Sequence, residues 1–436
     1  MTSENVLFNF SLFYSSKRSN RTFAVLVCSA LLATQALAQT ASQPAAATPQ
    51  PAPTLRQALD AAWQLSPSAR AEANRRSELA ARERAATSWI SGEPVAGVAH
   101  RTDRLNNNEG FREYEAELEL PLWNPGVRAA AQADVSAQRF SLDGQFVLTR
   151  LKLAGELRAL AASIATARVE RELYQRKLQD ANALGQDLSR RVKAGENARV
   201  DGLQSQVLVQ QAQAAIAQAE SQLSRYLSQW RSLTGLAAVA PLDEPLASSL
   251  SKQSDAAPVS ADHPALRSAQ AQVSSAQAKL ALATADKRDP MSVGLGVARE
   301  RGNFGGANET RLRIALRVPL GGDNRNAPRQ AAARAELDMA QADLDAAQRQ
   351  LPAEVAAANA DLSAARTAQT AARERVRLST EVQTLITKSW RLGDSDLPTR
   401  LRADNEQFEA SLQLARATID VQRAIASLNQ AHGILP

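Results

Sequence analysis

Two segments of the chain, at residues 111–120 and 311–318, have apolar and charged residues at alternating positions over most of their length. A period of two is typical of a β-strand with one apolar and one polar face. We therefore predict an amphipathic strand at each place. The charged positions that we expect on the polar face, which would line a lumen, are Glu115, Glu117, Glu119, Arg313 and Arg317.

A weaker strand pattern precedes each of these strands, at residues 93–101 and 291–297. Turns rich in asparagine and glycine, at residues 105–110 and 303–308, connect each weaker strand to its partner. Turn residues between two strand patterns favour a hairpin. The sequence therefore predicts two β-hairpins.

The rest of the chain has apolar residues spaced by three, four and seven, which predicts helices. Two of them are long, at residues 127–195 and 328–390, and about 60 residues at 1.5 Å each give a rod of roughly 90 Å. Pro352 should kink the second rod, because proline removes a backbone donor and clashes with the preceding turn. The shorter predicted helices span residues 54–63, 67–89, 203–233, 264–286 and 401–428.

The same order of elements occurs twice. Pro121 and Pro319, which end the two strong strands, lie 198 positions apart, and Gly195 and Gly393 have the same offset. A repeat of this length indicates two copies of one large unit rather than a solenoid. The predicted segments are a first half at residues 54–235, a connector at 236–262 and a second half at 263–436.

Residues 1–38 predict a secretory signal peptide. Basic residues precede a short apolar run at residues 22–33, and a small-residue cleavage site follows. The run is short for a membrane anchor, which is the alternative. We expect cleavage after Ala38, which would remove the only cysteine, Cys28, and leave a flexible lead-in at residues 39–53.

Composition narrows the class of protein. Aromatic residues make up 4% of the 436 residues, which favours long helical packing over one large core. The net charge is +6, but basic and acidic residues alternate, so the sequence predicts no nucleic-acid partner. His100, His263 and His432 lack metal-ligand spacing, and no phosphate loop or nucleophile constellation occurs. We therefore expect no cofactor, no metal site and no enzymatic activity.

Two isolated hairpins cannot form a stable sheet at the end of a long rod, because their edges stay unpaired. Strands of about ten residues with one apolar face suit a membrane-spanning barrel with a polar lumen. Four strands are too few for such a barrel, so we expect several chains to share it. Together with the signal peptide, this pattern predicts a protein of the bacterial outer membrane.

Over about residues 54–436 the sequence resembles the outer-membrane efflux factor family, the TolC-like channels. The resemblance lies in the duplicated halves, the Pro-Leu pairs at positions 121 and 319, and the two glycine-centred turns. It implies a mainly α-helical chain with a small β part that assembles as a homotrimer. The trimer would form a twelve-stranded barrel in the outer membrane on a long periplasmic helical barrel. The implied partners are a periplasmic adaptor and an inner-membrane resistance–nodulation–division pump.

The cargo stays open at this point. The short chain and small hairpin loops resemble most the channels of heavy-metal exporters, so heavy-metal cations are the expected cargo. Multidrug efflux and type I protein secretion are alternatives with the same fold. A periplasmic coiled-coil scaffold or adaptor is an alternative of another class, although it would not need two amphipathic hairpins.

The two glycine-centred turns carry the residues expected to contact the adaptor. Glycine at these turns allows a positive φ angle, which explains its presence structurally. The resemblance implies in addition a docking surface at the turns. Its candidate residues are Gly195, Glu196, Leu392 and Gly393.

Three aspartates next to these turns are candidates for a pore gate, namely Asp201, Asp394 and Asp396. In a trimer each would appear three times, and rings of carboxylates select cations. The alternative is that they only cap the helices that follow, since aspartate near a helix N-terminus is favourable without any pore. Asp201 corresponds to Thr399 in the second half, so its ring would have no counterpart there.

Overall fold

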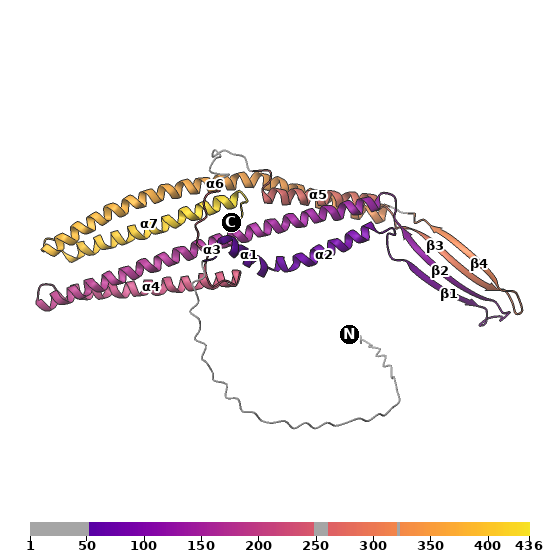
Figure 1. The fold of residues 1–436 in the computed structure, drawn as a ribbon, viewed down its shortest axis with the longest axis horizontal. Coiled ribbons are helices and arrows are strands. Elements are labelled where there is room, and N and C mark those ends of the chain that lie inside the picture. Colours follow the sequence, from indigo (N-terminus) through magenta and orange to yellow (C-terminus); the bar gives the residue numbers. More distant parts are fainter. Residues whose placement is uncertain (1–51, 248–259, 321–322) are drawn as a thin grey trace, which may run out of the picture. The chain divides into compact units, whose positions relative to one another are not determined.

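The computed structural model describes residues 52–247, 260–320 and 323–436. The predicted signal peptide, the lead-in up to residue 51 and residues 248–259 of the connector lie outside the described residues. The described chain has the mainly α-helical fold with a small β part that the sequence predicts (Figure 1).

The elements follow the same order in both halves. The first half contains α1 (Leu55–Leu65), α2 (Pro67–Thr87), β1 (Val95–Thr102), β2 (Arg112–Leu122), α3 (Val127–Ala194) and α4 (Arg199–Thr234). The second half contains α5 (Pro264–Ala285), β3 (Met291–Arg301), β4 (Glu309–Arg317), α6 (Asp323–Leu392) and α7 (Leu397–Ala431).

Side-chain caps fix where the short helices begin. The Thr54 hydroxyl accepts the Gln57 N–H at 3.2 Å, and the Gln57 side chain accepts the Thr54 N–H at 2.9 Å. This reciprocal capping box satisfies two backbone donors at the start of α1. Ser66 caps α2, and His263 caps α5 by accepting the Ala265 N–H at 3.1 Å; both helices have proline next. His263 therefore has a structural role.

The helices pack as two antiparallel pairs, α3 with α4 and α6 with α7, and the pairs meet where α3 contacts α7 (Figure 1). The largest apolar core lies between α1, α3, α4 and the start of the connector. At its centre Trp230 is fully buried, and its indole N–H donates to the Ala238 carbonyl at 3.0 Å. Leu59, Leu157 and Ile164 belong to the same core.

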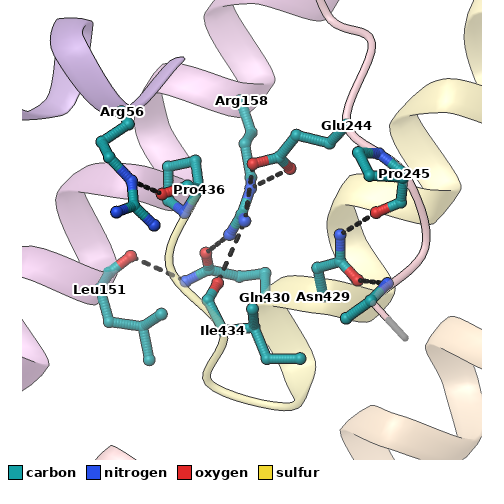
Figure 2. Close-up of polar contacts among 10 residues, drawn as sticks. Arg56, Leu151, Arg158, Glu244, Pro245, Asn429, Gln430, Ile434 and Pro436 are labelled. Atoms are coloured by element: carbon teal, nitrogen blue, oxygen red, sulfur yellow. Dashed lines mark hydrogen bonds and ion pairs between the residues drawn. The ribbon is translucent and has the colours of Figure 1, made fainter. Parts of the chain in front are cut away.

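We call the side chains of Arg158, Glu244, Gln430 and Asn429 the connector cluster. It joins α3 to the connector and to the end of α7 (Figure 2). Arg158 of α3, whose side chain is 4% exposed, donates to both carboxylate oxygens of Glu244, at 2.8 and 3.1 Å. It also donates to the Gln430 side chain at 2.6 Å and to the Ile434 carbonyl at 3.0 Å. Asn429, the fourth member, accepts the Ala247 N–H at 3.2 Å. The cluster therefore ties the connector and the end of α7 to the middle of α3.

The two hairpins join into one antiparallel sheet of four strands, in the order β1-β2-β3-β4 (Figure 1). β2 of the first half pairs with β3 of the second half over the whole length of both strands, with Leu118 opposite Leu295. The sheet is therefore built by both halves, and β1 and β4 form its edges.

The start of α6 differs from the prediction, since the helix begins at Asp323 rather than near residue 328. The helix continues through Pro352, the position of the predicted kink. Proline removes one backbone hydrogen bond and clashes with the preceding turn, so the packing on both sides of it must offset this cost. Leu351 and Val355, which flank the proline, are buried, so the packing of the helix continues on both sides. The strands also differ in length, and β3 extends to Arg301 instead of residue 297.

We expect Arg158→Ala to destabilise the protein by about 3–5 kcal/mol, because it leaves the largely buried Glu244 carboxylate without its partner. Arg76→Ala is the matched control, since Arg76 pairs with Asp143 at 3.1 Å on the surface and such pairs contribute about 0–1 kcal/mol. Unfolding of the detergent-extracted protein, followed by circular dichroism, measures both. Equal losses would contradict a stabilising role for the connector cluster.

Candidate functional site

The sheet has one apolar face, and it is largely exposed. Val98 of β1 is 88% exposed, and Leu312, Ile314 and Leu316 of β4 are 72%, 71% and 67% exposed. Leu295 and Val297 of the central strand β3 are also exposed. An apolar surface of this kind on a folded chain marks a contact with lipid or protein.

The other face of the sheet is polar and holds all five predicted lumen residues. Arg313 lies 3.3 Å from Glu115, and Arg317 lies 2.6 Å from Glu119. These pairs reach from β4 to β2 across the intervening strand β3. Glu117, between the two paired glutamates, makes no ion pair within the described chain.

Small residues in β3 allow these contacts. On the polar face β3 presents Ser292, Gly294 and Gly296, which lie between the glutamates of β2 and the arginines of β4. A Cβ atom at Gly294 would approach the Glu117 carboxylate to 2.8 Å. Glycine therefore leaves the space that the charged side chains use to meet.

At the opposite ends of the long helices, both predicted turn glycines adopt the left-handed conformation. Gly195 has φ +80° and Gly393 has φ +87°, and a Cβ atom at either would meet nothing within 4 Å. The Glu196 N–H donates to the Arg191 carbonyl at 2.9 Å and closes the end of α3. Leu392 is 70% exposed. The four candidate docking residues are thus accessible at the turns.

The three candidate gate aspartates have different surroundings. Asp396 caps α7 by accepting the Thr399 N–H at 3.0 Å, and hydrogen bonds from Thr399 lower the pKa of this carboxyl. Asp201 is half-buried and accepts the Asn197 side-chain amide at 2.9 Å. Asp394 is exposed, and its carboxylate has no partner within the described residues. Asp394 is therefore the one of the three whose carboxylate makes no hydrogen bond or ion pair within the described residues.

A tryptophan that the sequence analysis did not single out joins the two turns. Trp390, near the end of α6, is 5% exposed and lies between two guanidinium groups. The Arg191 and Arg400 groups lie 4.2 and 4.1 Å from the centre of its ring. Arginine stacks favourably on a tryptophan face. Arg191 comes from α3 and Arg400 from α7, so no local sequence pattern could reveal this contact.

A cavity of about 660 Å³ lies next to this tryptophan, between α3, α6 and α7. Burial, together with the nearby Asp404 carboxylate, raises the pKa of Asp180. The Lys177 ammonium lies over the Phe408 ring at 4.2 Å, and burial lowers its pKa. The charged groups of this cavity are thus partly desolvated at the contact between the two helix pairs.

The described residues contain no group of three or more histidine, cysteine or acidic side chains that could hold a metal ion. Within the same residues, no helix combines the length and apolar content needed to cross a membrane.

Comparison with known proteins finds one family match. Residues 259–434, in the second half of the chain, match the model of the outer membrane efflux protein family. No curated protein sequence matches the chain. Outer membrane efflux proteins are passive channels rather than enzymes.

The described fold is similar to solved membrane proteins of low sequence identity. A membrane protein from Pseudomonas aeruginosa is 18% identical, with a TM-score of 0.70 over 87% of this chain and 90% of that chain. VceC from Vibrio cholerae is 15% identical, with a TM-score of 0.69 over 87% of this chain and 96% of that chain. CusC is 15% identical, with a TM-score of 0.69 over 87% of this chain and 92% of that chain. The described chain therefore has the same fold as these solved proteins.

We expect Asp394→Asn to lower the cation preference of single channels in planar bilayers, because it removes an exposed carboxylate next to the turn. Asp420→Asn is the control, since Asp420 pairs with Arg423 at 2.9 Å on α7 away from the turn. Reversal potentials in a salt gradient measure the preference. An unchanged potential for Asp394→Asn would place the gate elsewhere.

Proposed function

We propose that the chain is one subunit of a trimeric outer-membrane efflux channel. Three sheets would close into a twelve-stranded barrel, and the helices would continue it as a periplasmic duct. The channel would be passive, and its turns would dock on a periplasmic adaptor and an inner-membrane pump of the resistance–nodulation–division class.

The observation behind this proposal is the four-stranded sheet with two free edges, one exposed apolar face and one charged face. Lipid would cover the apolar face, and the charged face would line the lumen. Closing the sheet with other copies removes both edges, which an isolated sheet leaves open to aggregation. Neither a scaffold nor an adaptor needs a sheet of this kind.

Apolar stripes on the helices support assembly near the turns. Val200, Leu203 and Val207 follow one face of α4 and are each more than half exposed. On α6, Leu378, Val382 and Leu385 form a similar exposed stripe. Because α3 and α7 make the contact between the helix pairs within the chain, α4 and α6 are left for neighbouring copies. Side chains spaced by three and four on both helices suit coiled-coil packing between subunits.

Heavy-metal cations are the proposed cargo, and the short turns between the strands are consistent with this class. The duct itself needs no metal site, because selection of the cargo would occur in the pump. Multidrug efflux and protein secretion are the competing cargoes, and sensitivity of a deletion strain to metals or to drugs would distinguish them.

We expect Ile314→Arg to impair insertion of the barrel, because an arginine on the lipid face near the bilayer midplane costs about 2–4 kcal/mol. Arg313→Gln is the control on the lumen face of the same strand, and it should insert as wild type does. Membrane fractionation and the mass of the detergent-extracted protein measure the result. A wild-type protein that is a soluble monomer without detergent would contradict the proposed channel, and equal insertion of both variants would contradict the assigned faces.

We expect valine at both Gly195 and Gly393 to abolish export while the trimer still forms, because a β-branched residue cannot adopt their positive φ angles without strain. Gly126→Val is the matched control. Gly126 has φ +81° and open space around it, but it lies at the barrel end of α3. Growth of a complemented deletion strain on divalent metals measures export. Normal growth of the double variant would show that the turns are not the docking surface.

A further inference from the structure

The internal repeat of this chain determines how the free edges of the sheet can pair with a second copy. Val95 lies opposite Glu119 in the first hairpin, and Ser292 lies opposite Arg317 in the second. Val95 and Ser292 are 197 positions apart, and Glu119 and Arg317 are 198 positions apart. β3 is therefore the repeat equivalent of β1, and β4 is the equivalent of β2.

The contact between β2 and β3 joins the two halves within one chain. If neighbouring copies repeat this contact, β4 of one copy takes the place of β2, and β1 of the next copy takes the place of β3. The pair of Leu118 and Leu295 then corresponds to Leu316 of one copy opposite Val98 of the next. The pair of Glu119 and Gly294 corresponds to Arg317 of one copy opposite Gly97 of the next.

We propose that β4 of each subunit pairs antiparallel with β1 of the next in this register, and that Arg317 then forms an ion pair with Glu117 of the neighbouring subunit across Gly97. This proposal rests on the proposed channel assembly and specifies its subunit contact. Each subunit thus supplies an arginine to the barrel wall of the next.

The faces of the residues that would meet agree with this register. Leu316 and Val98 both belong to the apolar face, where they are 67% and 88% exposed in the single chain. Arg317 belongs to the polar face, and Gly97 lies beside Glu117 in the first hairpin. A shift by one residue would place apolar side chains in the lumen, because side chains alternate along a strand. Only shifts by two residues keep the faces matched.

The charges also agree. Within the chain, Arg317 already reaches Glu119 across the small residues of β3 at 2.6 Å, so an arginine on this face spans one intervening strand. Across the subunit boundary, Gly97 would be the intervening residue, and a Cβ atom there would meet nothing within 4 Å. Glu117, on the far side of Gly97, makes no ion pair within the described chain. In the single chain Glu117 lies over Gly294, so a change of side-chain rotamer brings it to the new partner.

Disulfide formation tests the register. In a Cys28→Ser background, which removes the only native cysteine, Leu316→Cys is combined with Val98→Cys, Ala96→Cys or His100→Cys. Residues directly opposite have Cβ atoms about 4.5–5.5 Å apart, whereas diagonal neighbours are about 7–8 Å apart. Copper-catalysed oxidation of outer membranes should therefore link subunits fastest in the Val98 pair. Fastest linking at position 96 or 100, or no linking in an intact trimer, would overturn the register and leave the proposed channel standing. Loss of the trimer in the background protein itself would contradict both.

Glu117→Gln tests the ion pair. We expect it to shift dissociation of the detergent-extracted trimer to a lower temperature, whereas Glu78→Gln should not, because Glu78 pairs only with Arg82 on the surface of α2. High salt should reduce the difference between wild type and Glu117→Gln. An unchanged dissociation temperature for Glu117→Gln would overturn the ion pair.

Discussion

The free edges of the sheet are the constraint on which the rest of this molecule depends. β1 and β4 each lack a strand partner on one side within the described chain, and the apolar side chains between them face outward. Unpaired strand edges template aggregation, and an exposed apolar face adds to the hazard. Insertion into lipid covers the face but leaves the edges open, because the bilayer offers no hydrogen-bonding groups. Only pairing with strands of further copies gives the edges hydrogen-bond partners while lipid covers the apolar face. The duplicated hairpin places a strand that can form such a pair at each edge.

The connector cluster contributes to the contact between the two helix pairs. The two helix pairs contact each other along α3 and α7, and α5 packs against both α3 and α6. Arg158 adds a polar link between the pairs, since its guanidinium binds the connector through Glu244 and the end of α7 through Gln430 (Figure 2). A buried arginine without partners would be costly, so the connector and the end of α7 must be in place together. Toward the turns, Trp390 of α6 contacts Arg191 of α3 and Arg400 of α7.

The sequence predicts the elements of this fold well and the contacts between them poorly. The alternation of glutamate with apolar residues in β2 and the glycines at 195 and 393 are local signals, and the structure confirms the strand and both turn conformations. The single sheet from two hairpins, the stack on Trp390 and the pair of Arg158 with Glu244 join distant segments, so no period or motif encodes them. The predicted kink at Pro352 lies inside α6, which continues as one helix on both sides of the proline.

The two ends of the described chain differ in how their charges are arranged, and this difference bears on where a passive duct can select ions. On the polar face of the sheet, Arg313 and Arg317 are paired with Glu115 and Glu119, so the charges of the wall largely cancel. Close pairs of opposite charge produce little field at the centre of a wide lumen. At the turns, the Asp394 carboxylate stays exposed and unpaired among the described residues. In the proposed trimer this carboxylate would appear three times. Any effect of the passive duct on passing ions would therefore come from the turns rather than from the barrel wall, while the pump would select the cargo.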